Sequence, residues 1–451
     1  MMSITKLLTR LLPLFLGIAI PLSVFSAQGP IEEIIVTAER QAENLQSVAV
    51  AVTAFTGEEM DAQGIVDIKG ITERTPGFTM GVFNPGQPQF YIRGIGSNED
   101  GAGGDQSVIV FIDEVYIGRS AGSDFDLFDL ERVEVLRGPQ GTLFGKNVIG
   151  GAVSLVTKKP TEETLMKFEG TVGNLEEISV RGLVSGALAD NVFGKVSFSS
   201  RRRDGYVDSR IDEFPQFFPD TSVDDQHDIN TDSIRAALRF TPTDRLEINL
   251  TANYSTMDRA GPTYLAIGPG GIPFLQSISL DSNYGDDIHE NFVEDPGSSE
   301  TDIFGLTARF DYELTDSITF TSLTSFRNVD SEQIWALASP NLAELYMSNG
   351  VNSGGPVPLA IAGNNDYTDE SDTFTHEFRF TGGNDKLFWI AGLYYMTEDT
   401  DRFETSNIAL ISDIIAPGVT VRIPGQFPGI VPGDDQGNET TSYSIFGQFT
   451  Y

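Results

Sequence analysis

The chain of 451 residues contains no cysteine and few basic side chains. Without cysteine it can form neither disulfides nor thiolate metal sites, and no thiol can act as a nucleophile. Its 29 Lys and Arg residues are outnumbered by 65 Asp and Glu, which gives a net charge of −36. Because phosphate binding needs clustered cations, we expect no nucleic-acid partner. Only three histidines are present, which argues mildly against haem, and we expect no cofactor.

Long apolar runs are also scarce, and the one that exists lies at the start of the chain. Lys6 and Arg10 precede an apolar stretch, so residues 1–26 match the basic and apolar regions of a secretory signal peptide. A membrane anchor is the alternative, but Pro13 and Pro21 interrupt the stretch and it is short for a bilayer. With 46 glycines, 10% aromatic residues and only 21% charged ones, the rest is too apolar for a disordered acidic protein.

From Thr164 onward, apolar and polar side chains alternate with a period of two. In one such segment an apolar face of Leu246, Ile248, Leu250, Ala252 and Tyr254 is separated by polar residues. A helix would show a period of 3.6, so these segments are predicted to be strands. We expect ten of them, at about 164–173, 177–189, 191–203, 231–242, 244–258, 301–314, 317–331, 371–382, 385–399 and 440–451.

The connections between these strands alternate in length. Tight links near 189–191, 242–244, 315–317 and 382–385 alternate with long ones at about 204–230, 259–300, 333–370 and 400–438. Short turns at one end and long loops at the other are typical of a bacterial outer-membrane barrel. A soluble β-sandwich or propeller is the alternative, but its loop lengths need not alternate in this way. We therefore predict a mainly β chain with an antiparallel transmembrane sheet.

Residues 32–158 have a different character, with short strands and glycine-rich turns. Val108–Tyr116, Val133–Leu136 and Ala152–Thr157 read as strands, and Gly138–Gly141 as a turn. The segment is long enough for a compact domain. A barrel of about eight strands is filled by its own side chains, whereas 22 strands can hold a plugged lumen. Ten strands cannot enclose this domain.

Several motifs resemble the TonB-dependent outer-membrane receptors of Gram-negative bacteria. The runs ERVEVLRGPQGTLFGKNVIGGAVSLVTKKP at 131–160, YIRGIG at 91–96 and VIVFIDEVYIGR at 108–119 are similar to that family's plug. The run IEEIIVTAER at 31–40 looks like its TonB box. The resemblance implies an α+β plug at 41–160 inside a 22-stranded barrel, of which 161–451 is a part. We therefore expect an N-terminal fragment in the cell outer membrane, in contact with lipid and lipopolysaccharide.

The proposed box consists of Glu33, Ile34, Ile35, Val36, Thr37 and Ala38, and its residue types give a physical reason for partner binding. Its β-branched residues can add as a strand to the edge of a partner's sheet, where main-chain hydrogen bonds supply the affinity. The resemblance implies that this partner is TonB, the energy-coupling protein of the inner membrane. The alternative is an ordinary first strand of the plug.

Charged and glycine residues of the plug have predicted structural roles. Arg93, Arg132 and Arg137 are expected to form ion pairs within the plug or to the barrel wall, because guanidinium groups make bidentate contacts. For neighbouring Glu131 a solvated charge is the alternative. Gly138, Gly141, Gly145, Gly150 and Gly151 are read as turn and close-packing positions.

Three motifs that suggest other chemistry are rejected. Gly118–Gly122 matches the G-x-S-x-G pattern of esterases, but no clear helix follows, so we expect no enzyme. Gly141–Lys146 is one residue short of a phosphate loop, and Asn147 follows where Ser or Thr is required. Acidic residues near 224–228 and 281–290 could bind calcium, but their spacing fits no EF-hand, so a solvated loop is favoured.

The family resemblance implies uptake of a large scarce nutrient, most often a ferric siderophore. Cobalamin or an oligosaccharide is the alternative cargo, and a passive receptor or adhesin the alternative function. The resemblance places cargo-contacting plug loops near 82–89 and 97–106, where the candidate residues are Phe83, Asn84, Gln87, Asn98 and Asp105. The acidic loops would repel anions, which slightly favours a neutral or cationic cargo.

Overall fold

The computed structural model describes most of the chain, namely residues 34–37, 40–41, 43–84, 86–99, 101–123, 128–209, 226–261, 290–291, 297–336, 359–384, 386–412, 421–423 and 433–451. The predicted signal peptide lies outside these residues, as do Glu33 and Ala38 of the predicted box. Of the acidic loop residues considered for calcium, only Asp228 and Glu290 lie within them.

One large antiparallel sheet forms the second half of the described chain. Its strands follow one another in chain order, with the short β22 (Val421–Ile423) and β23 both beside β21. The ten long strands are β11 (Leu165–Val172), β12 (Ile178–Ala189), β13 (Val192–Arg203), β15 (Ile229–Thr243), β16 (Leu246–Ala260), β18 (Ser298–Thr315), β19 (Ile318–Ala336), β20 (Leu359–Asn384), β21 (Leu387–Ser412) and β23 (Asp434–Thr450). All ten predicted strands are confirmed, and so is the mainly β fold.

The two faces of this sheet differ as the alternation predicts. In β18, Thr301 and Ile303 are buried against the plug side, whereas Phe304 and Leu306 are 38% and 45% exposed on the other face. The same alternation recurs in β13 and β20. The sheet therefore presents an apolar outer face and a largely polar inner one, as an outer-membrane barrel does.

Two strands continue well into segments predicted to be loops. β20 begins at Leu359 and β21 ends at Ser412, where these residues pair, although the strands were expected to begin near 371 and to end near 399. Within the added part of β20, residues 363–370 are mostly polar, with Asp366, Asp369 and Glu370 among them. The alternating pattern therefore disappears there, whereas the backbone ladder does not depend on it.

The plug contains a five-stranded sheet in the order β3-β9-β10-β7-β8. Its strands are β3 (Val52–Thr56), β7 (Val108–Ile112), β8 (Val115–Ile117), β9 (Leu130–Arg137) and β10 (Gly151–Thr157). The prediction of a single strand over 108–116 is wrong. Asp113 and Glu114 have φ of 48° and 72° and form a tight turn that folds the run into the β7–β8 hairpin.

The sequence analysis expected an α+β plug but assigned no helix to particular residues, although one helix has a clear sequence signal. α2 (Gly57–Gln63) begins with a capping box in which Thr56 and Glu59 bond each other's backbone N–H. α3 (Ile68–Arg74) is capped by Asp67. α4 (Gly141–Phe144) starts where the predicted turn ends. The remaining elements are short: β1 (Ile35–Val36), β2 (Glu43–Asn44), β4 (Phe78–Asn84), β5 (Gln87–Ile92), β6 (Ile95–Gly96), η2 (Ala121–Ser123), β14 (Asp208–Ser209) and β17 (Glu290–Asn291).

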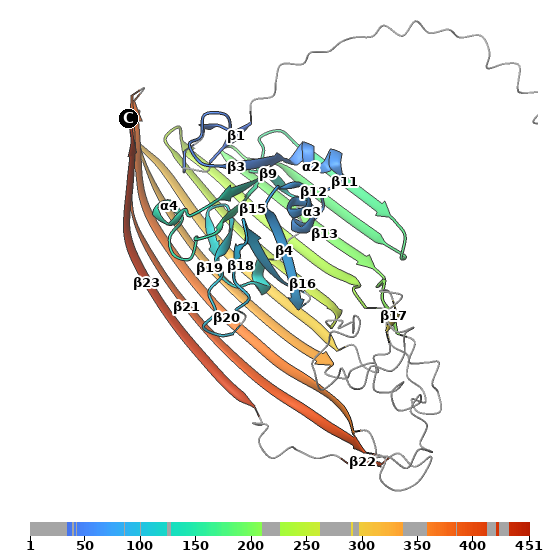
Figure 1. Cartoon of the computed structure of the whole chain (residues 1–451). Helices are drawn as coiled ribbons and strands as arrows, with labels where there is room; N and C mark the ends of the chain where they lie inside the picture. The colour runs from blue at the N-terminus through green and yellow to red at the C-terminus, as the bar shows by residue number, and fades with distance from the viewer. Residues whose placement is uncertain are drawn as a thin grey trace, which may run out of the picture.

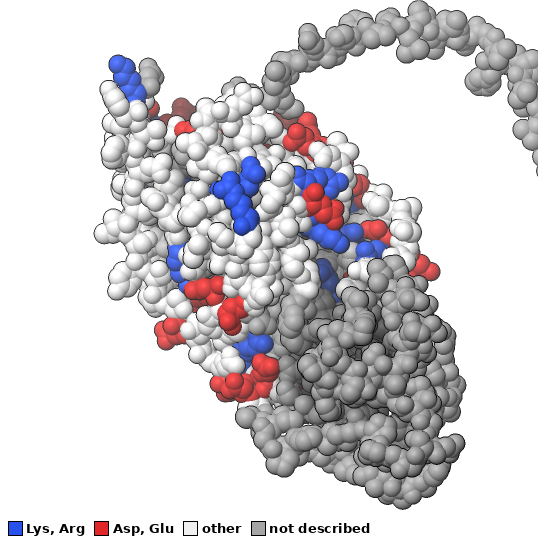
Figure 2. All heavy atoms as spheres, viewed as in Figure 1, with Lys and Arg blue, Asp and Glu red and all other residues white. Residues whose placement is uncertain are grey.

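The large sheet curves around the plug, which lies on its concave side (Figure 1). β1 lies at the same end of the sheet as the chain's C-terminus, and the extended ends of β20 and β21 lie at the opposite end (Figure 1). Charged side chains of both signs interleave over the described face in the space-filling view (Figure 2). Among the described residues, no helix has the length and apolar character needed to cross a membrane.

Candidate functional site

The segment predicted to be the TonB box is attached to the plug by a very short strand. Ile35 and Val36 pair antiparallel with Asn44 and Glu43, and Leu45 donates its N–H to the carbonyl of Ile34. Val36 is fully buried in an apolar cluster of the plug, whereas Ile35 is 43% exposed. A two-residue ladder with one buried anchor holds the segment in place while leaving few backbone bonds to break.

Thr37, which follows β1, is bound by a single carboxylate of the plug sheet, that of Glu134. Thr37 donates its backbone N–H and its hydroxyl to Oε1 of Glu134 in β9, at 2.8 and 3.1 Å. The same oxygen accepts the Nε–H of Arg132 at 2.8 Å, and Arg132 Nη2 donates to the Thr37 hydroxyl at 3.2 Å. Glu134 is completely buried. Because buried charged groups are costly when unpaired, these contacts depend on one another.

Three residues further along the chain, Arg40 forms a second attachment. It is 4% exposed, has a positive φ of 59°, and lies with its guanidinium carbon 4.8 Å from the centre of the Phe144 ring. Its Nη1 donates to Oε2 of Glu114, and its Nε donates to the Leu143 carbonyl at 3.4 Å. The 34–41 region is therefore tied to the plug at Glu134 and at Glu114.

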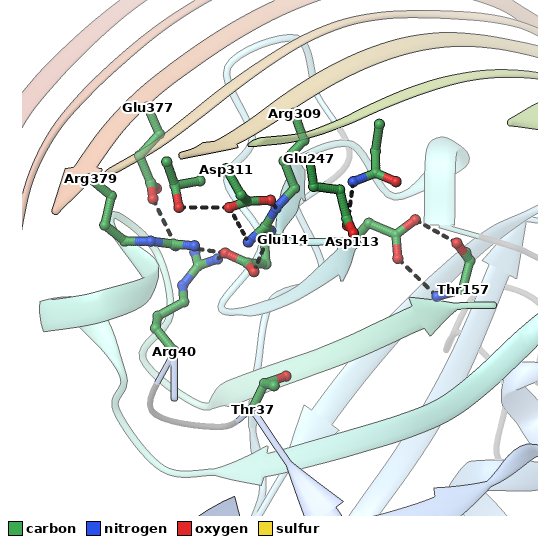
Figure 3. A network of polar contacts seen from close by, with 12 residues as sticks. Thr37, Arg40, Asp113, Glu114, Thr157, Glu247, Arg309, Asp311, Glu377 and Arg379 are labelled. Carbon is green, nitrogen blue, oxygen red and sulfur yellow. Dashed lines mark hydrogen bonds and ion pairs between the residues drawn. The ribbon is translucent and has the colours of Figure 1, made fainter. Parts of the chain in front are cut away.

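Glu114 is the centre of a charge network that joins the plug to the barrel wall (Figure 3). Arg309 of β18 donates to its Oε1 at 2.7 Å, and Arg379 of β20 donates to its Oε2 at 2.6 Å. Each wall arginine also has a carboxylate on its own strand, Asp311 at 2.7 Å and Glu377 at 2.9 Å. The carboxylate thus binds three guanidinium groups from three separate parts of the chain.

The electrostatics of Glu114 follow from these neighbours. Burial by itself would raise the pKa of its carboxyl group. The positive charges of Arg309, Arg379 and Arg40 outweigh burial and hold the pKa well below its ordinary value of 4.5. Glu114 therefore stays ionised at all physiological pH values, and its ion pairs with the three arginines persist.

Other contacts hold the opposite side of the plug to strands β11–β13. Asp129 accepts from Lys195 Nζ at 2.8 Å with each of its carboxylate oxygens and from the Ser197 hydroxyl at 2.9 Å. Lys195 is 2% exposed. Two partly exposed pairs, Asp61 with Lys167 and Asp67 with Arg201, add weaker contacts from α2 and the start of α3. Polar bonds rather than an apolar interface thus fix the plug to the wall here.

The predicted charged residues separate into two groups. Arg132 pairs with Glu131 at 2.6 Å and with Glu134 at 2.8 Å. The ion pairs expected of Arg93 and Arg137 are not found with any carboxylate in the described part of the chain. Arg93 instead lies exposed at a positive φ of 53° in the turn between β5 and β6. A guanidinium there is solvated, which removes the need for a carboxylate partner.

The predicted glycines also differ in how far the fold requires them. Gly151 has φ of 153°, and a Cβ there would lie 2.2 Å from the Leu136 carbonyl oxygen. Gly150 would meet the Ile95 carbonyl at 2.8 Å, whereas Gly138 and Gly145 have positive φ without such crowding. Gly141 begins α4, and a Cβ there would meet nothing within 4 Å. Close packing is therefore concentrated at Gly150 and Gly151.

The predicted cargo-contacting residues lie in and beside the β4–β5 hairpin. Phe83 and Asn84 are the last residues of β4, and Gln87 begins β5. Gln87 is 5% exposed, and its side-chain oxygen accepts from the Tyr367 hydroxyl of β20 at 3.2 Å. Asn98 is exposed and accepts from the Tyr91 hydroxyl, and Asp105 pairs with Lys146 at 3.3 Å. Gln87 thus already contacts the wall, whereas Asn98 and Asp105 remain accessible.

The contacts described above are hydrogen bonds and ion pairs that attach the box to the plug and the plug to the wall. Ser120 of the G-x-S-x-G match donates its hydroxyl to the Pro88 carbonyl at 2.5 Å. His376 lies on the outer face of β20, with its Nδ1 2.7 Å from the Thr324 hydroxyl. In the described part of the chain no three potential metal ligands cluster.

The roles of Arg40 and Glu114 were missed in the sequence analysis. Arg40 lies 74 residues from Glu114, and the two wall arginines that bind Glu114 lie 195 and 265 residues away along the chain.

A family model described as "TonB-dependent Receptor Plug Domain" matches residues 44–152. A vitamin B12 transporter of Photobacterium profundum is 28% identical over 219 residues, which are 47% of this chain and 34% of that protein. A pesticin receptor of Yersinia pestis is 27% identical over 246 residues, 53% of this chain and 34% of that protein. This chain therefore spans about a third of the length of these curated relatives.

Solved structures show the same fold at low identity. The ferripyoverdine receptor of Pseudomonas aeruginosa, bound to ferripyoverdine, matches with a TM-score of 0.65 and 16% identity. The match covers 92% of this chain and 56% of that structure. A plug on the concave side of an antiparallel sheet is thus the architecture of known receptors.

Proposed function

Since its plug domain places this chain among the TonB-dependent outer-membrane receptors, we propose that it serves the active uptake of a large, scarce nutrient, most often a ferric siderophore complex in such proteins. The observation that carries the proposal is the attachment of residues 34–37. A two-residue strand and one carboxylate hold this segment on a plug that ion pairs fix to the barrel wall.

The segment is suited to strand addition by a partner. Ile34, Ile35, Val36 and Thr37 favour extended backbone, and breaking only the short β1–β2 ladder frees them. An exposed edge of this kind pairs with a partner's sheet through main-chain hydrogen bonds. In this proposal the partner is TonB, which binds the box from Glu33 to Ala38 and pulls on it. Force then reaches Glu134 through Thr37 and Glu114 through Arg40.

The cargo enters from the opposite end of the sheet. Phe83, Asn84, Gln87, Asn98 and Asp105 are the proposed contacts of the plug, and the barrel's outer face lies in lipid and lipopolysaccharide. Two relatives support two cargo classes, a ferripyoverdine receptor a ferric siderophore and a vitamin B12 transporter cobalamin. An oligosaccharide cargo and a passive receptor or adhesin are the alternatives.

An Ile35→Pro variant tests the transport proposal. Ile35 is half exposed, so the substitution removes a backbone N–H from the box without disturbing the plug core. Cells carrying the variant are compared with cells carrying Ile35→Val, which keeps the N–H and the extended preference. Binding to whole cells and energy-dependent uptake are measured for ferric siderophores, cobalamin and oligosaccharides.

The two readouts separate the functions. We expect Ile35→Pro to bind one cargo normally while its uptake falls to the level of cells without the receptor, and Ile35→Val to transport it. Uptake that persists in Ile35→Pro contradicts energy coupling through the box. Binding without energy-dependent uptake in the unsubstituted protein supports the passive receptor instead.

A further inference from the structure

Two cavities lie between the plug and the barrel wall, one beyond the other along β19. The inner cavity, of about 280 Å³, is lined by Thr37 of the box and by β15, β16, β18 and β19. Lys159 also lines it with a side chain that is 60% exposed, so this cavity is open to solvent on that side. The outer cavity, of about 20 Å³, is lined by Gln87 and Gln106 of the plug and by Val329 of β19. The outer cavity therefore lies beside the proposed cargo contacts, and the inner one beside the box.

The inner cavity has a neutral polar surface along β16. Asn249, Thr251 and Asn253 alternate along that strand, and all three line the cavity. Thr307 of β18 and Ser325 of β19 continue this surface, with their hydroxyl oxygens 3.4 Å apart. Amide and hydroxyl groups can each donate and accept hydrogen bonds. This part of the wall therefore offers a hydrophilic cargo the same kind of partner as water does.

A small apolar cluster separates the two cavities. It consists of Ala121 of η2 on the plug and of Met257, Ile303 and Val329 on β16, β18 and β19, and we call these four residues the gate. All four are buried, at 6% exposure or less. On its own strand, each wall residue of the gate lies beyond the residues that line the inner cavity, on the side away from the box. Ala121 and Val329 also line the outer cavity.

The plug approaches the wall closely at the gate, but through little apolar surface. A Cβ at Gly122, next to Ala121, would lie 3.1 Å from Cγ2 of Val329. The Gly122 carbonyl accepts from Nη2 of Arg327 at 2.7 Å. Among the described residues, Ala121 is the one side chain of the plug in this cluster. Because apolar stabilisation follows the area removed from water, an alanine adds little to it.

The plug meets β21 through a larger apolar cluster, which we call the β21 contact. Phe111, Tyr116 and Phe144 of the plug belong to it together with Ile390 and Met396 of β21. The ring centres of Phe111 and Phe144 lie 5.1 Å apart in an edge-to-face arrangement. Aromatic side chains bury far more apolar area than an alanine does. Separating the plug from the wall therefore costs less at the gate than at the β21 contact.

We propose that the cargo passes the plug at the gate, where η2 moves away from β16, β18 and β19 and the two cavities join into one passage. The passage deepens the proposed function and, as regards cargo movement, rests on it. Closed apolar constrictions exclude water and hydrated solutes. Because Thr37 lines the inner cavity, withdrawing the box removes part of its lining and widens the space behind the gate. The plug stays on the wall at the β21 contact while the gate opens.

Two buried methionines of the wall test the gate without cargo or energy. Met257 is 2% exposed at the gate, and Met396 is fully buried at the β21 contact. Because the chain contains no cysteine, Met257→Cys and Met396→Cys each carry a single thiol. The rate at which a water-soluble maleimide labels each thiol is measured on the folded, purified protein and divided by the rate for the same variant unfolded in urea.

We expect Met257→Cys to be labelled about tenfold or more faster than Met396→Cys, because local opening exposes a weakly held region first. Urea unfolding of both variants shows whether either one is globally destabilised, and the comparison is made at equal global stability. Equal rates, or faster labelling of Met396→Cys, overturn the gate.

A disulfide across the gate tests the passage itself. Cγ2 of Val329 is bonded to its Cβ, so Gly122→Cys with Val329→Cys suits the spacing of about 3.5–4.5 Å between the Cβ atoms of a disulfide. The control pair is Thr161→Cys with Ser185→Cys, whose native hydroxyls lie 2.9 Å apart. It joins the linker after β10 to β12, outside the gate. Binding and energy-dependent uptake of ferric siderophores, cobalamin and oligosaccharides are measured in cells carrying each pair, first oxidised and then reduced.

We expect the oxidised gate pair to bind one cargo normally while its uptake falls to the level of cells without the receptor, and reduction to restore uptake. The oxidised control pair should transport as the unsubstituted chain does. Uptake that continues in the fully oxidised gate pair overturns the passage, and so does an equal loss in the control pair. If the unsubstituted chain shows no energy-dependent uptake, the proposed function is contradicted, and the labelling rates alone decide whether the gate opens.

Discussion

Thr37 donates both its backbone N–H and its hydroxyl to one carboxylate oxygen of Glu134, across 97 residues of sequence. Arg132 bonds to the same oxygen, so three donors converge on a fully buried group. The other oxygen of Glu134 has no hydrogen-bond partner within the described structure. The hydrogen bonds at Thr37 therefore converge on one atom, and a single substitution removes all of those that Glu134 accepts.

We expect Glu134→Ala to loosen the box, because the β1–β2 ladder and the Arg40–Glu114 ion pair then hold it without the contact at Thr37. A loosened box opens more often and then exposes Arg40, whose side chain is 4% exposed when attached, so trypsin should cleave after it more often. Cleavage should accelerate about tenfold or more, because each hydrogen bond to a charged group contributes about 1.5–3 kcal/mol. The rate is followed by mass spectrometry of the released N-terminal peptide.

Two controls accompany this variant. Glu134→Gln keeps an oxygen acceptor for Thr37 and should be cleaved at an intermediate rate. Glu131→Ala removes a carboxylate that is 54% exposed and that, among the described residues, bonds only to Arg132, and it should behave as the unsubstituted chain. Equal rates in Glu134→Ala and Glu131→Ala would show that Glu134 does not hold the box.

The low pKa of Glu114 predicts a pH-dependent contribution to stability. Because its folded pKa lies below the ordinary value of 4.5, the stabilisation is fully present above about pH 4.5 and is lost as the pH falls through the folded value. Glu114→Gln, which leaves three arginines without their shared anion, should cost about 3 kcal/mol near neutral pH. The cost should shrink as the pH falls below 4.5.

Urea unfolding in lipid vesicles at several pH values measures this difference. Glu131→Gln is the control, because its carboxylate is half exposed and should give a small difference at every pH. A cost of Glu114→Gln that stays constant down to strongly acidic pH would mean that the ion pairs do not set the stability of the network.

The strands of the large sheet were predictable because half of their side chains face lipid and half face the lumen. Because the two faces meet different surroundings, apolar residues such as Phe304, Leu306 and Phe310 alternate with polar ones in the sequence. The signal is lost where both faces are polar, as at 366–372, so β20 was predicted too short. It is also lost where both faces are buried, so the β7–β8 hairpin was predicted as one strand.

The candidate site was predictable only in part, for a different reason. The β-branched residues from Ile34 to Thr37 mark an extended segment by local preference, which one sequence shows. The partner of Glu114 is not a local property, because Arg309 and Arg379 approach it only when the plug meets the wall. The sequence shows which residues of the plug are charged, but it does not show which residues of the barrel wall they pair with.

The buried pair of Lys195 and Asp129 should contribute strongly to holding the plug. Lys195→Met leaves an unpaired carboxylate that also bonds Ser197, and it should cost about 3–5 kcal/mol. Replacing both residues, as Lys195→Met with Asp129→Leu, should recover much of this loss, because no buried charge then remains unpaired. Lys167→Met is the control, since its pair with Asp61 is partly exposed and should cost less than about 1 kcal/mol. Urea unfolding of the three proteins measures the differences, and equal costs for Lys195→Met and Lys167→Met would contradict a role for burial.

Gly151 and Gly141 form a matched pair for testing the glycine-rich plug motif. Alanine at Gly151 must adopt φ of 153° with its Cβ 2.2 Å from the Leu136 carbonyl oxygen, where β9 and β10 pair. We expect Gly151→Ala to cost about 2–4 kcal/mol of unfolding free energy, from backbone strain and overpacking together. Gly141→Ala should be neutral or stabilising by about 0.5–1 kcal/mol, because the position is open and begins a helix. The urea unfolding midpoints of the two variants and of the unsubstituted chain measure these differences in stability. If Gly141→Ala were as costly as Gly151→Ala, the requirement for glycine would come from something other than the close approach of these two strands.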